Sequence, residues 1–251
     1  MGTQHHYFRG VIGAGLLAIT LASCSGSTAA APLLLSQRSR SVVPRNVGRD
    51  AGDTTSSGVR GQCAQATQGA IPLTALLPAA TAHPGQTQAA YPTLWFYLPE
   101  TTATTADFWL LDENEQLVYE LEFELTGQVG LIALPLDRME GMPALEPDQR
   151  YTWYFALVCD PQDRGVDIYV TGPLERLPLP PAQAAHLDGL DPYQRALAYA
   201  ELGLWQDLVA QVAELYRQAP EDGNLAGLWS QVLREAGLEE LIAAKFSDWE
   251  L

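Results

Sequence analysis

The sequence predicts a β-sandwich followed by an α-helical region, and three observations lead to that prediction. Between residues 63 and 172, short apolar or alternating runs recur with frequent turns. Prolines then gather over residues 173–190, and helical signals fill residues 191–251. Seven short strands within roughly 110 residues are typical of a sandwich rather than of alternating strands and helices.

The chain begins with the features of a secretory signal. Arg9 supplies a positive charge, and residues 11–22 form an apolar run that is too short to cross a bilayer as a helix. The run ends in Leu21-Ala22-Ser23-Cys24, the order found in bacterial lipoprotein signals, where the cysteine is lipidated. We therefore predict a signal peptide over residues 1–23 and lipidation at Cys24. An ordinary signal peptide cleaved nearby is the alternative.

Residues 24–62 are rich in small and polar residues, which predicts a flexible tether. Residues 25–60 carry five arginines and two aspartates, so contact with an anionic surface is an alternative to a solvated linker. No later segment is apolar for 18 residues, so the lipid would be the membrane anchor. Ser25 is not the aspartate that retains some lipoproteins at the inner membrane. We therefore expect the periplasmic side of the outer membrane, or otherwise a secreted or periplasmic protein.

Charge and cysteine content describe the body that follows. Residues 61–251 contain 8 basic and 28 acidic side chains, a net charge of −20, so we expect no nucleic-acid partner. Three cysteines are an odd number, and lipidation of Cys24 would leave Cys63 and Cys159 as a pair in an oxidising compartment. We predict that they form a disulfide, with two unpaired thiols as the alternative.

The candidate strands have two kinds of pattern. Residues 92–99 are almost wholly apolar or aromatic, whereas Gln116–Leu125 alternates. In the alternating strand, residues 117, 119, 121, 123 and 125 share an apolar face, and Glu120, Glu122 and Glu124 point the other way, towards water. The seven candidates are Ile71–Leu77, Tyr91–Leu98, Asp107–Asp112, Gln116–Leu125, Val129–Leu136, Tyr151–Cys159 and Val166–Val170.

One spacing refines the sandwich prediction. The sequence Leu145-x-Pro147-x-x-x-Tyr151 resembles the tyrosine corner of immunoglobulin-like and fibronectin-like sandwiches. In that corner, a tyrosine bonds back to the backbone a few residues upstream. The cysteines depart from the antibody pattern, because a bond between Cys63 and Cys159 would hold the start of the domain rather than clamp the two sheets together.

The helical region begins after the proline-rich residues 173–190, which predict a stiff connector without a helix or strand. Asp191 suits a helix N-cap and Pro192 suits the first helical position. Glu201-Leu202-Gly203-Leu204 recurs 34 residues later as Glu235-Ala236-Gly237-Leu238, and residues 208–210 are echoed by 242–244. Two unrelated amphipathic helices would be the alternative to a true repeat.

A 34-residue period resembles the tetratricopeptide helical hairpin. Tyr199, Gly203, Trp205 and Pro220 fit that family's pattern, while Leu208 replaces its usual alanine. About one and a half repeats are present, and repeats of this kind need about three to be stable alone. We therefore expect the helices to dock on the sandwich or on a partner.

From Gly58 onward the chain resembles a cyanobacterial family, catalogued as domain of unknown function 928. The resemblance lies in Arg60-Gly61-Gln62-Cys63, in residues 92–99, in Tyr151-Thr152-Trp153 leading to Cys159, and in residues 203–207. It implies a cyanobacterial envelope protein, and it implies no activity, substrate or cofactor.

The sequence offers no catalytic constellation, so we expect a non-enzymatic protein without a metal or cofactor. His83 and His186 are far apart, and Asp112-x-Asn114 lacks the glycine and glutamate of a calcium loop. The glutamate row could serve a hydrolase, but its spacing fits a solvated strand face better.

We therefore predict an envelope lipoprotein that acts as a protein-interaction or structural module for an unidentified envelope protein. Trp205, Trp229 and Trp249 are the candidate contact residues, although Trp229 and Trp249 could equally be core. The alternative is a glycan-binding module, which would use strand aromatics. These are Trp95, Tyr97, Trp109, Trp153 and Tyr154, which we expect to be mostly core, with the helices covering Trp95 and Tyr97.

Overall fold

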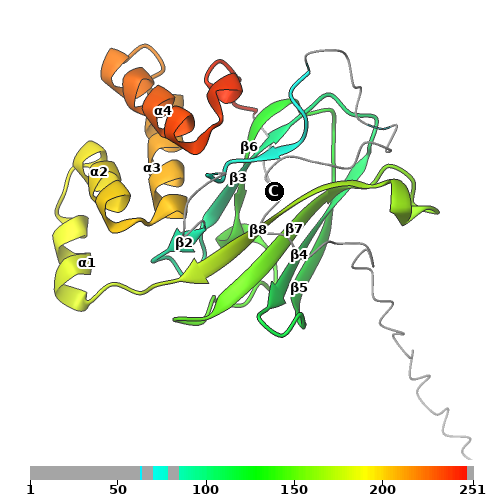
Figure 1. Cartoon of the computed structure of the whole chain (residues 1–251), viewed down its shortest axis with the longest axis horizontal. Helices are drawn as coiled ribbons and strands as arrows, with labels where there is room; N and C mark the ends of the chain where they lie inside the picture. Colours follow the sequence, from blue (N-terminus) through cyan, green and yellow to red (C-terminus); the bar gives the residue numbers. More distant parts are fainter. Residues whose placement is uncertain (1–62, 64–69, 79–84, 248–251) are drawn as a thin grey trace, which may run out of the picture. The chain divides into compact units, whose positions relative to one another are not determined.

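The computed structural model describes residues 63, 70–78 and 85–247, and these residues form two packed β-sheets with helices on one side (Figure 1). The strands are β1 (Thr74–Ala75), β2 (Gln86–Thr87), β3 (Thr93–Leu98), β4 (Thr105–Asp112), β5 (Leu117–Glu124), β6 (Gly130–Pro135), β7 (Arg150–Leu157) and β8 (Ile168–Arg176). One sheet has the order β1-β3-β6 and the other has the order β2-β8-β7-β4-β5. All pairings between these strands are antiparallel except that of β2 with β8.

The helices follow the sandwich in the chain. They are α1 (Pro181–Asp188), α2 (Pro192–Leu202), α3 (Trp205–Gln218) and α4 (Gly223–Ala236), and short 3₁₀ turns lie at Leu136–Arg138, Arg164–Val166 and Glu239–Leu241. The expected sandwich followed by helices is therefore confirmed. The predicted signal peptide, Cys24 and the tether lie outside the described residues, as do His83 and Trp249.

The sandwich core lies between the two sheets and is rich in aromatic rings. Phe96 on β3 stacks on Phe155 on β7, with ring centroids 4.5 Å apart, and meets the edge of Trp153 at 5.3 Å. All three side chains are almost fully buried. The alternation of Tyr151–Cys159 is thus realised, because its apolar face is the one that packs against the three-stranded sheet.

A second core lies on the other side of β3, beneath the helices. Trp95 points away from Phe96 and joins a cluster with Val209, Trp229 and other apolar side chains of α2, α3 and α4. Leu76 and Leu131 of the sandwich also belong to this cluster. The helices therefore cover Trp95 and Tyr97, as the sequence predicts, and the apolar run at residues 92–99 reflects a strand that is buried on both faces.

Polar bonds fix the helices to the sandwich at its edge. The Trp205 indole N–H donates to the carbonyl of Leu76 at 2.8 Å. The backbone N–H of Gln88 donates to the Asp207 carboxylate at 3.0 Å, and the Gln88 side chain donates to the Tyr199 hydroxyl at 3.0 Å. These bonds join segments that are more than 100 residues apart in the chain.

The 34-residue echo corresponds to two equivalent helix ends. Gly203 ends α2 and Gly237 ends α4, both in the left-handed conformation, with φ of 72° and 75°. The N–H of the next leucine then bonds five residues back in each case, as in a Schellman cap. The copies diverge afterwards, because Gly203 leads into the long helix α3 whereas Gly237 leads only into a 3₁₀ turn. The expected helical echo at residues 242–244 is therefore wrong.

The expected connector at residues 173–190 also needs correction. Strand β8 continues through Pro173 to Arg176, and α1 occupies Pro181–Asp188. The N–H of Glu175 donates to Gly85 on the β2 side, so by alternation the nitrogen of Pro173 also faces that side and not β7. Pro181 takes the first helical position, where a missing N–H costs nothing.

Candidate functional site

The five-stranded sheet has an outer face that belongs to neither core. Its central row runs across three paired strands, with Trp109 on β4 opposite Tyr154 on β7 and Thr171 on β8. Glu120 on β5 lies on the other side of Trp109. The outer side chains of β4, β5, β7 and β8 therefore form a continuous surface of aromatic, hydroxyl and carboxylate groups.

Two of the five aromatic residues proposed for a platform lie on this face. Trp153 is in the sandwich core, and Trp95 and Tyr97 pack with the helices. Trp109 and Tyr154 remain, and Tyr169 joins them with its ring centroid 6.3 Å from that of Tyr154. Sequence reasoning missed Tyr169, although its place between Ile168 and Val170, both core residues, could have assigned it to the outer face.

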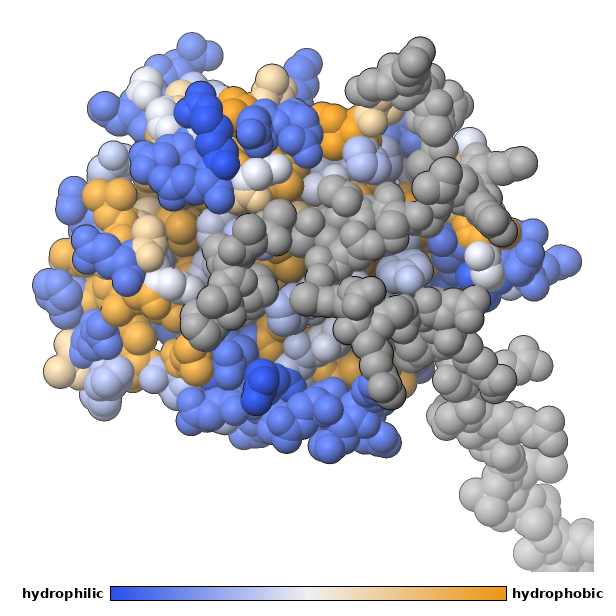
Figure 2. Space-filling model, in the orientation of Figure 1, coloured by the Kyte–Doolittle hydropathy of each residue, from blue (hydrophilic) through white to orange (hydrophobic). Residues whose placement is uncertain are grey.

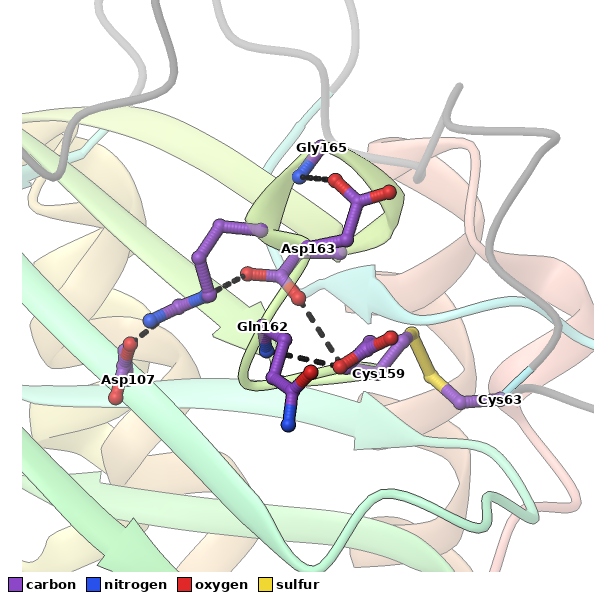
Figure 3. Close-up of polar contacts among 9 residues, drawn as sticks. Cys63, Asp107, Cys159, Gln162, Asp163 and Gly165 are labelled. Carbon is purple, nitrogen blue, oxygen red and sulfur yellow. Dashed lines mark hydrogen bonds and ion pairs between the residues drawn. A yellow bond between two sulfur atoms is a disulfide. The ribbon is translucent and has the colours of Figure 1, made fainter.

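At one end of this face, Arg164 contacts three residues, Trp109, Asp107 and Asp167. Its guanidinium lies 5.8 Å from the centre of the Trp109 ring. It also forms 2.5 Å ion pairs with Asp107 and Asp167, and Figure 3 draws these polar contacts as dashed lines. A guanidinium over an indole ring is a favourable cation–π arrangement. Trp109 is only 5% exposed, so the ring is not an open stacking platform.

The predicted disulfide between Cys63 and Cys159 is present, with Cα atoms 5.2 Å apart, and it lies beside the Arg164 loop (Figure 3). Asp167 binds both features, because its carboxylate accepts from the Cys159 N–H at 3.0 Å and from Arg164. Burial raises the pKa of Asp167 above that of an ordinary aspartate, although these hydrogen bonds oppose the shift. Asp160 and Asp163 cap backbone N–H groups of the same loop, which is therefore fixed by its own carboxylates.

The margin of the site is strand β5, whose side chains alternate between two environments. Glu120, Glu122 and Glu124 are exposed on the outer face, whereas Leu121 and Phe123 are half-buried against the core. Leu117 departs from the predicted pattern, since it is 51% exposed. A register shift between Leu110 and Leu111 pairs Leu111 with Leu117 and leaves Val118 as the extra residue, which turns Leu117 to the other face.

The turn before β5 continues this polar margin. Asp112 accepts hydrogen bonds from the backbone N–H groups of Asn114 and Gln116, each at 2.8 Å, so its carboxylate organises the turn. Figure 2 shows a hydrophilic band at the lower edge of the molecule, where Figure 1 places the β4–β5 hairpin.

The corner residues behave as their spacing predicts. The Tyr151 hydroxyl accepts a 3.0 Å hydrogen bond from the N–H of Glu146, which precedes Pro147. Leu145 is buried, and its carbonyl accepts from Arg176 at 2.7 Å. These bonds set the approach of the chain to β7, the strand that carries Tyr154.

Two of the three tryptophans proposed as partner contacts, Trp205 and Trp229, lie within the described residues, and both pack inside the protein. Trp229 is fully buried and packs against Phe246 and Tyr216, with ring centroids 5.7 and 6.0 Å away, so its assignment as a contact residue is wrong and the core alternative holds. Trp205 is partly buried, and its N–H is bonded to Leu76. Both rings belong to the cluster that the helices share with Trp95 of β3.

The described part of the chain shows neither a metal-binding cluster nor a membrane-spanning helix. Residues 63, 70–78 and 85–247 contain no group of three or more His, Cys, Asp or Glu side chains arranged to hold a metal ion. Within the same residues, no helix combines the length and apolar character needed to cross a membrane.

Comparison with known protein families shows to which family the chain belongs. The family model described as Domain of Unknown Function (DUF928) matches residues 55–246, which is most of the chain and includes both sheets and all four helices. The chain belongs to the DUF928 family. The sandwich and the helices thus form one DUF928 unit, and the outer sheet face, the Arg164 loop and the disulfide all lie inside it.

The other comparisons add little to the DUF928 assignment. No curated protein matches the chain. Among solved structures, the fn3 domain of the human collagen alpha-1(XX) chain is 10% identical, with 37% of this chain and 75% of that chain covered and a TM-score of 0.24.

Proposed function

We propose that the chain is a non-enzymatic protein-binding module of a cyanobacterial cell envelope. In this proposal, a lipid on Cys24 anchors it to the periplasmic side of the outer membrane. The folded body then presents the outer face of the five-stranded sheet to a partner protein.

The observation that carries the proposal is the unequal cover of the two sheets. The helices pack on the outer side of β3 and bury Trp95 there, whereas the outer face of the five-stranded sheet carries half-buried Tyr154 and Tyr169. Tyrosines on a sheet face suit a protein interface, because they supply rigid contact area together with a polar tip.

The helices have a supporting role in this proposal. A tetratricopeptide-like hairpin α2–α3, followed by the single helix α4, uses its apolar side to cover the sandwich. Trp205 and Trp229 then stabilise the module and do not select the partner. The body charge of −20 favours a partner with a basic surface and opposes binding to nucleic acid or to anionic lipid.

The proposal is tested by crosslinking in intact cells at defined positions. A photo-reactive phenylalanine analogue replaces Tyr154 or Tyr169 in one set of strains and Glu221 in the control strain, since Glu221 is an exposed residue between α3 and α4. We expect one discrete protein adduct from the two sheet positions and none from the control. Equal adducts from all three positions, or none from any, contradict the proposal.

The anchor is tested separately with radiolabelled palmitate. The wild type should incorporate the label and Cys24→Ala should not. Equal labelling of both proteins excludes lipidation at Cys24.

A second candidate function is glycan binding, which the cluster of Trp109, Tyr154 and Tyr169 on one face favours. Against it, the Trp109 ring is covered, and sugar platforms use an exposed ring face. Titration with envelope polysaccharides discriminates between the two, because a glycan ligand should change the tryptophan fluorescence of the wild type and not that of Tyr154→Ala/Tyr169→Ala.

A further inference from the structure

Strand β5 is an edge with one free side. It is eight residues long and lies last in the order β2-β8-β7-β4-β5, so among the described residues it pairs with β4 alone. An unpaired edge presents a row of backbone N–H and C=O groups that another strand can use.

The register shows which residues direct their backbone to the free side. The N–H of Leu125 donates to the carbonyl of its opposite residue Thr104 at 2.8 Å. Because hydrogen bonding alternates along an antiparallel pair, Phe123, Leu121 and Tyr119 also bond to β4. The backbone groups of Glu120, Glu122 and Glu124 therefore point away from β4, to the free edge.

The side chains of the same strand define what could lie beside it. The three glutamates are exposed on the outer face at every second position, whereas Leu121 and Phe123 are half-buried on the inner face. A strand added at this edge would place alternate side chains opposite the carboxylates and the intervening ones beside the apolar row.

A second copy of the chain does not fit this edge. Pairing two β5 edges would bring two rows of glutamate face to face, and like charges directly opposite each other are destabilising. The row thus guards against self-pairing, and the same charges favour a strand of the opposite sign.

We propose that β5 accepts an extended segment of a partner protein, with lysine or arginine at alternate positions and apolar residues between them, which adds to the sheet as a further strand. This inference depends on the proposed protein-binding function and names the edge and the partner chemistry. The basic side chains pair with Glu120, Glu122 and Glu124, and the partner's backbone bonds to the free N–H and C=O groups of the same three residues.

The probe is a fluorescently labelled peptide of sequence Thr-Lys-Val-Lys-Val-Lys-Thr, blocked at both ends, and the readout is fluorescence anisotropy with the full-length protein at low salt. The comparison peptide has glutamate in place of each lysine. We expect saturable binding of the lysine peptide, weakening as salt is raised, and no binding of the glutamate peptide. Absence of lysine-peptide binding overturns the proposal, and the three glutamates of β5 would then serve only to prevent two copies of the strand from pairing.

Variants separate the charge from the backbone contribution. Glu120→Gln/Glu122→Gln/Glu124→Gln should weaken binding by roughly tenfold, since three opposed-charge pairs are lost. The control Glu221→Gln/Glu239→Gln/Glu240→Gln removes the same charge from exposed sites in the helical region and should leave binding unchanged. Equal weakening by both triple variants means that only net charge matters, which overturns the proposal.

Glu122→Pro tests the backbone directly. The N–H that it removes faces the free edge, so the bonds to β4 are kept, and near-UV circular dichroism verifies the fold. Binding should fall well below that of Glu122→Gln, which loses the same charge but keeps the N–H. Equal affinity of these two variants for the peptide overturns the proposal that the partner adds as a strand. A stable dimer of the wild type in sedimentation also overturns it, because two copies would then pair at this edge. If the wild type does not bind the lysine peptide but the Tyr154 crosslink still forms, the result rejects this edge and keeps the proposed function.

Discussion

Strands β3 and β5 belong to one sandwich but have different surroundings. On β3, Phe96 packs against the other sheet and Trp95 packs beneath the helices, so both faces are covered. On β5, only one face meets the core, and Glu120, Glu122 and Glu124 remain in water. A strand that is buried on both faces is apolar along its length, whereas a strand that is buried on one face alternates between apolar and charged residues. The comparison shows that β3 contributes mainly to stability and β5 mainly to the chemistry of the surface.

The largest expected effect is on the doubly covered strand. Phe96→Ala should lower the free energy of unfolding by about 3–5 kcal/mol, because it removes a fully buried ring that contacts Trp153 and Phe155. Chemical denaturation of the variant and the wild type measures the difference. A loss below about 1 kcal/mol would mean that the core can collapse around the missing ring.

Trp95→Ala is the matched change on the opposite face of β3. It should act on the helical side, because Trp95 meets Phe246 with ring centroids 5.6 Å apart and packs with α3 and α4. Amide hydrogen exchange should therefore rise in α3 and α4 more than in β7. Equal increases in both regions would show that the two cores do not separate in this way.

The disulfide is expected to have the next largest effect, because it closes a loop between residues 96 positions apart. Cys63→Ser/Cys159→Ser should cost about 2–4 kcal/mol of stability. Denaturation under non-reducing conditions measures the loss, and reduction of the wild type serves as the comparison. Equal stability of the double variant and the oxidised wild type would show that the sandwich does not depend on this bond.

A pH effect should follow at the joint between the helices and β2. Burial raises the pKa of Asp207 from 3.8 to about 6, against hydrogen bonds from Thr87 and Gln88. Since the folded state holds this proton more tightly than the unfolded state, its stabilising contribution is complete below about pH 4 and is lost as pH rises through about 6. The loss amounts to up to about 3 kcal/mol.

Asp207→Asn tests this joint, because the amide keeps an acceptor oxygen and cannot ionise. We expect the variant to be more stable than the wild type at pH 7.5 and the difference to shrink towards pH 4. Thermal or chemical unfolding across this range measures it. A difference that does not change with pH would assign the effect to packing rather than to ionisation.

The smallest expected effect is on the singly covered strand. Glu122→Gln should change the free energy of unfolding by less than about 0.5 kcal/mol, because the side chain is exposed. The same denaturation assay sets this value against Phe96→Ala. A loss of several kcal/mol would show that the outer face of β5 is covered after all.

The sequence predicted those parts of the fold that follow from local pattern. The spacing of apolar residues predicted the positions of β3, β4, β5, β6 and β7. Capping chemistry predicted the start of α2 at Asp191-Pro192, and the Asp191 carboxylate does accept hydrogen bonds from the N–H groups of Tyr193 and Gln194. The cover over Trp95 also followed from pattern, because an apolar strand needs two partners. The pairing of Cys63 with Cys159 followed from the cysteine count once Cys24 was set aside as the predicted lipidation site.

Features that depend on tertiary contacts were not predictable in this way. Strand β2 has two residues and no period of its own, and β8 runs through Pro173 because the proline nitrogen faces the side away from β7. The bulge at Leu110/Leu111 reversed Leu117, and an amphipathic helix does not reveal whether Trp229 faces a partner or its own sandwich. Arg164 lies in a loop, and its two aspartate partners come together only in the folded chain.

The Cys63–Cys159 bond also decides how a mechanical load would enter the domain. Any pull on the segment before Cys63 passes through the sulfur atoms to the end of β7, which is held between β4 and β8 along its length. The chain between the two cysteines is then bypassed and is not stretched. With the bond reduced, the same pull would reach β1, which has two residues and, within the described part of the chain, pairs with β3 alone. That strand would then separate from its sheet first. The oxidised domain should therefore resist extension from its N-terminal side by shear of a central strand, in which many hydrogen bonds must break together.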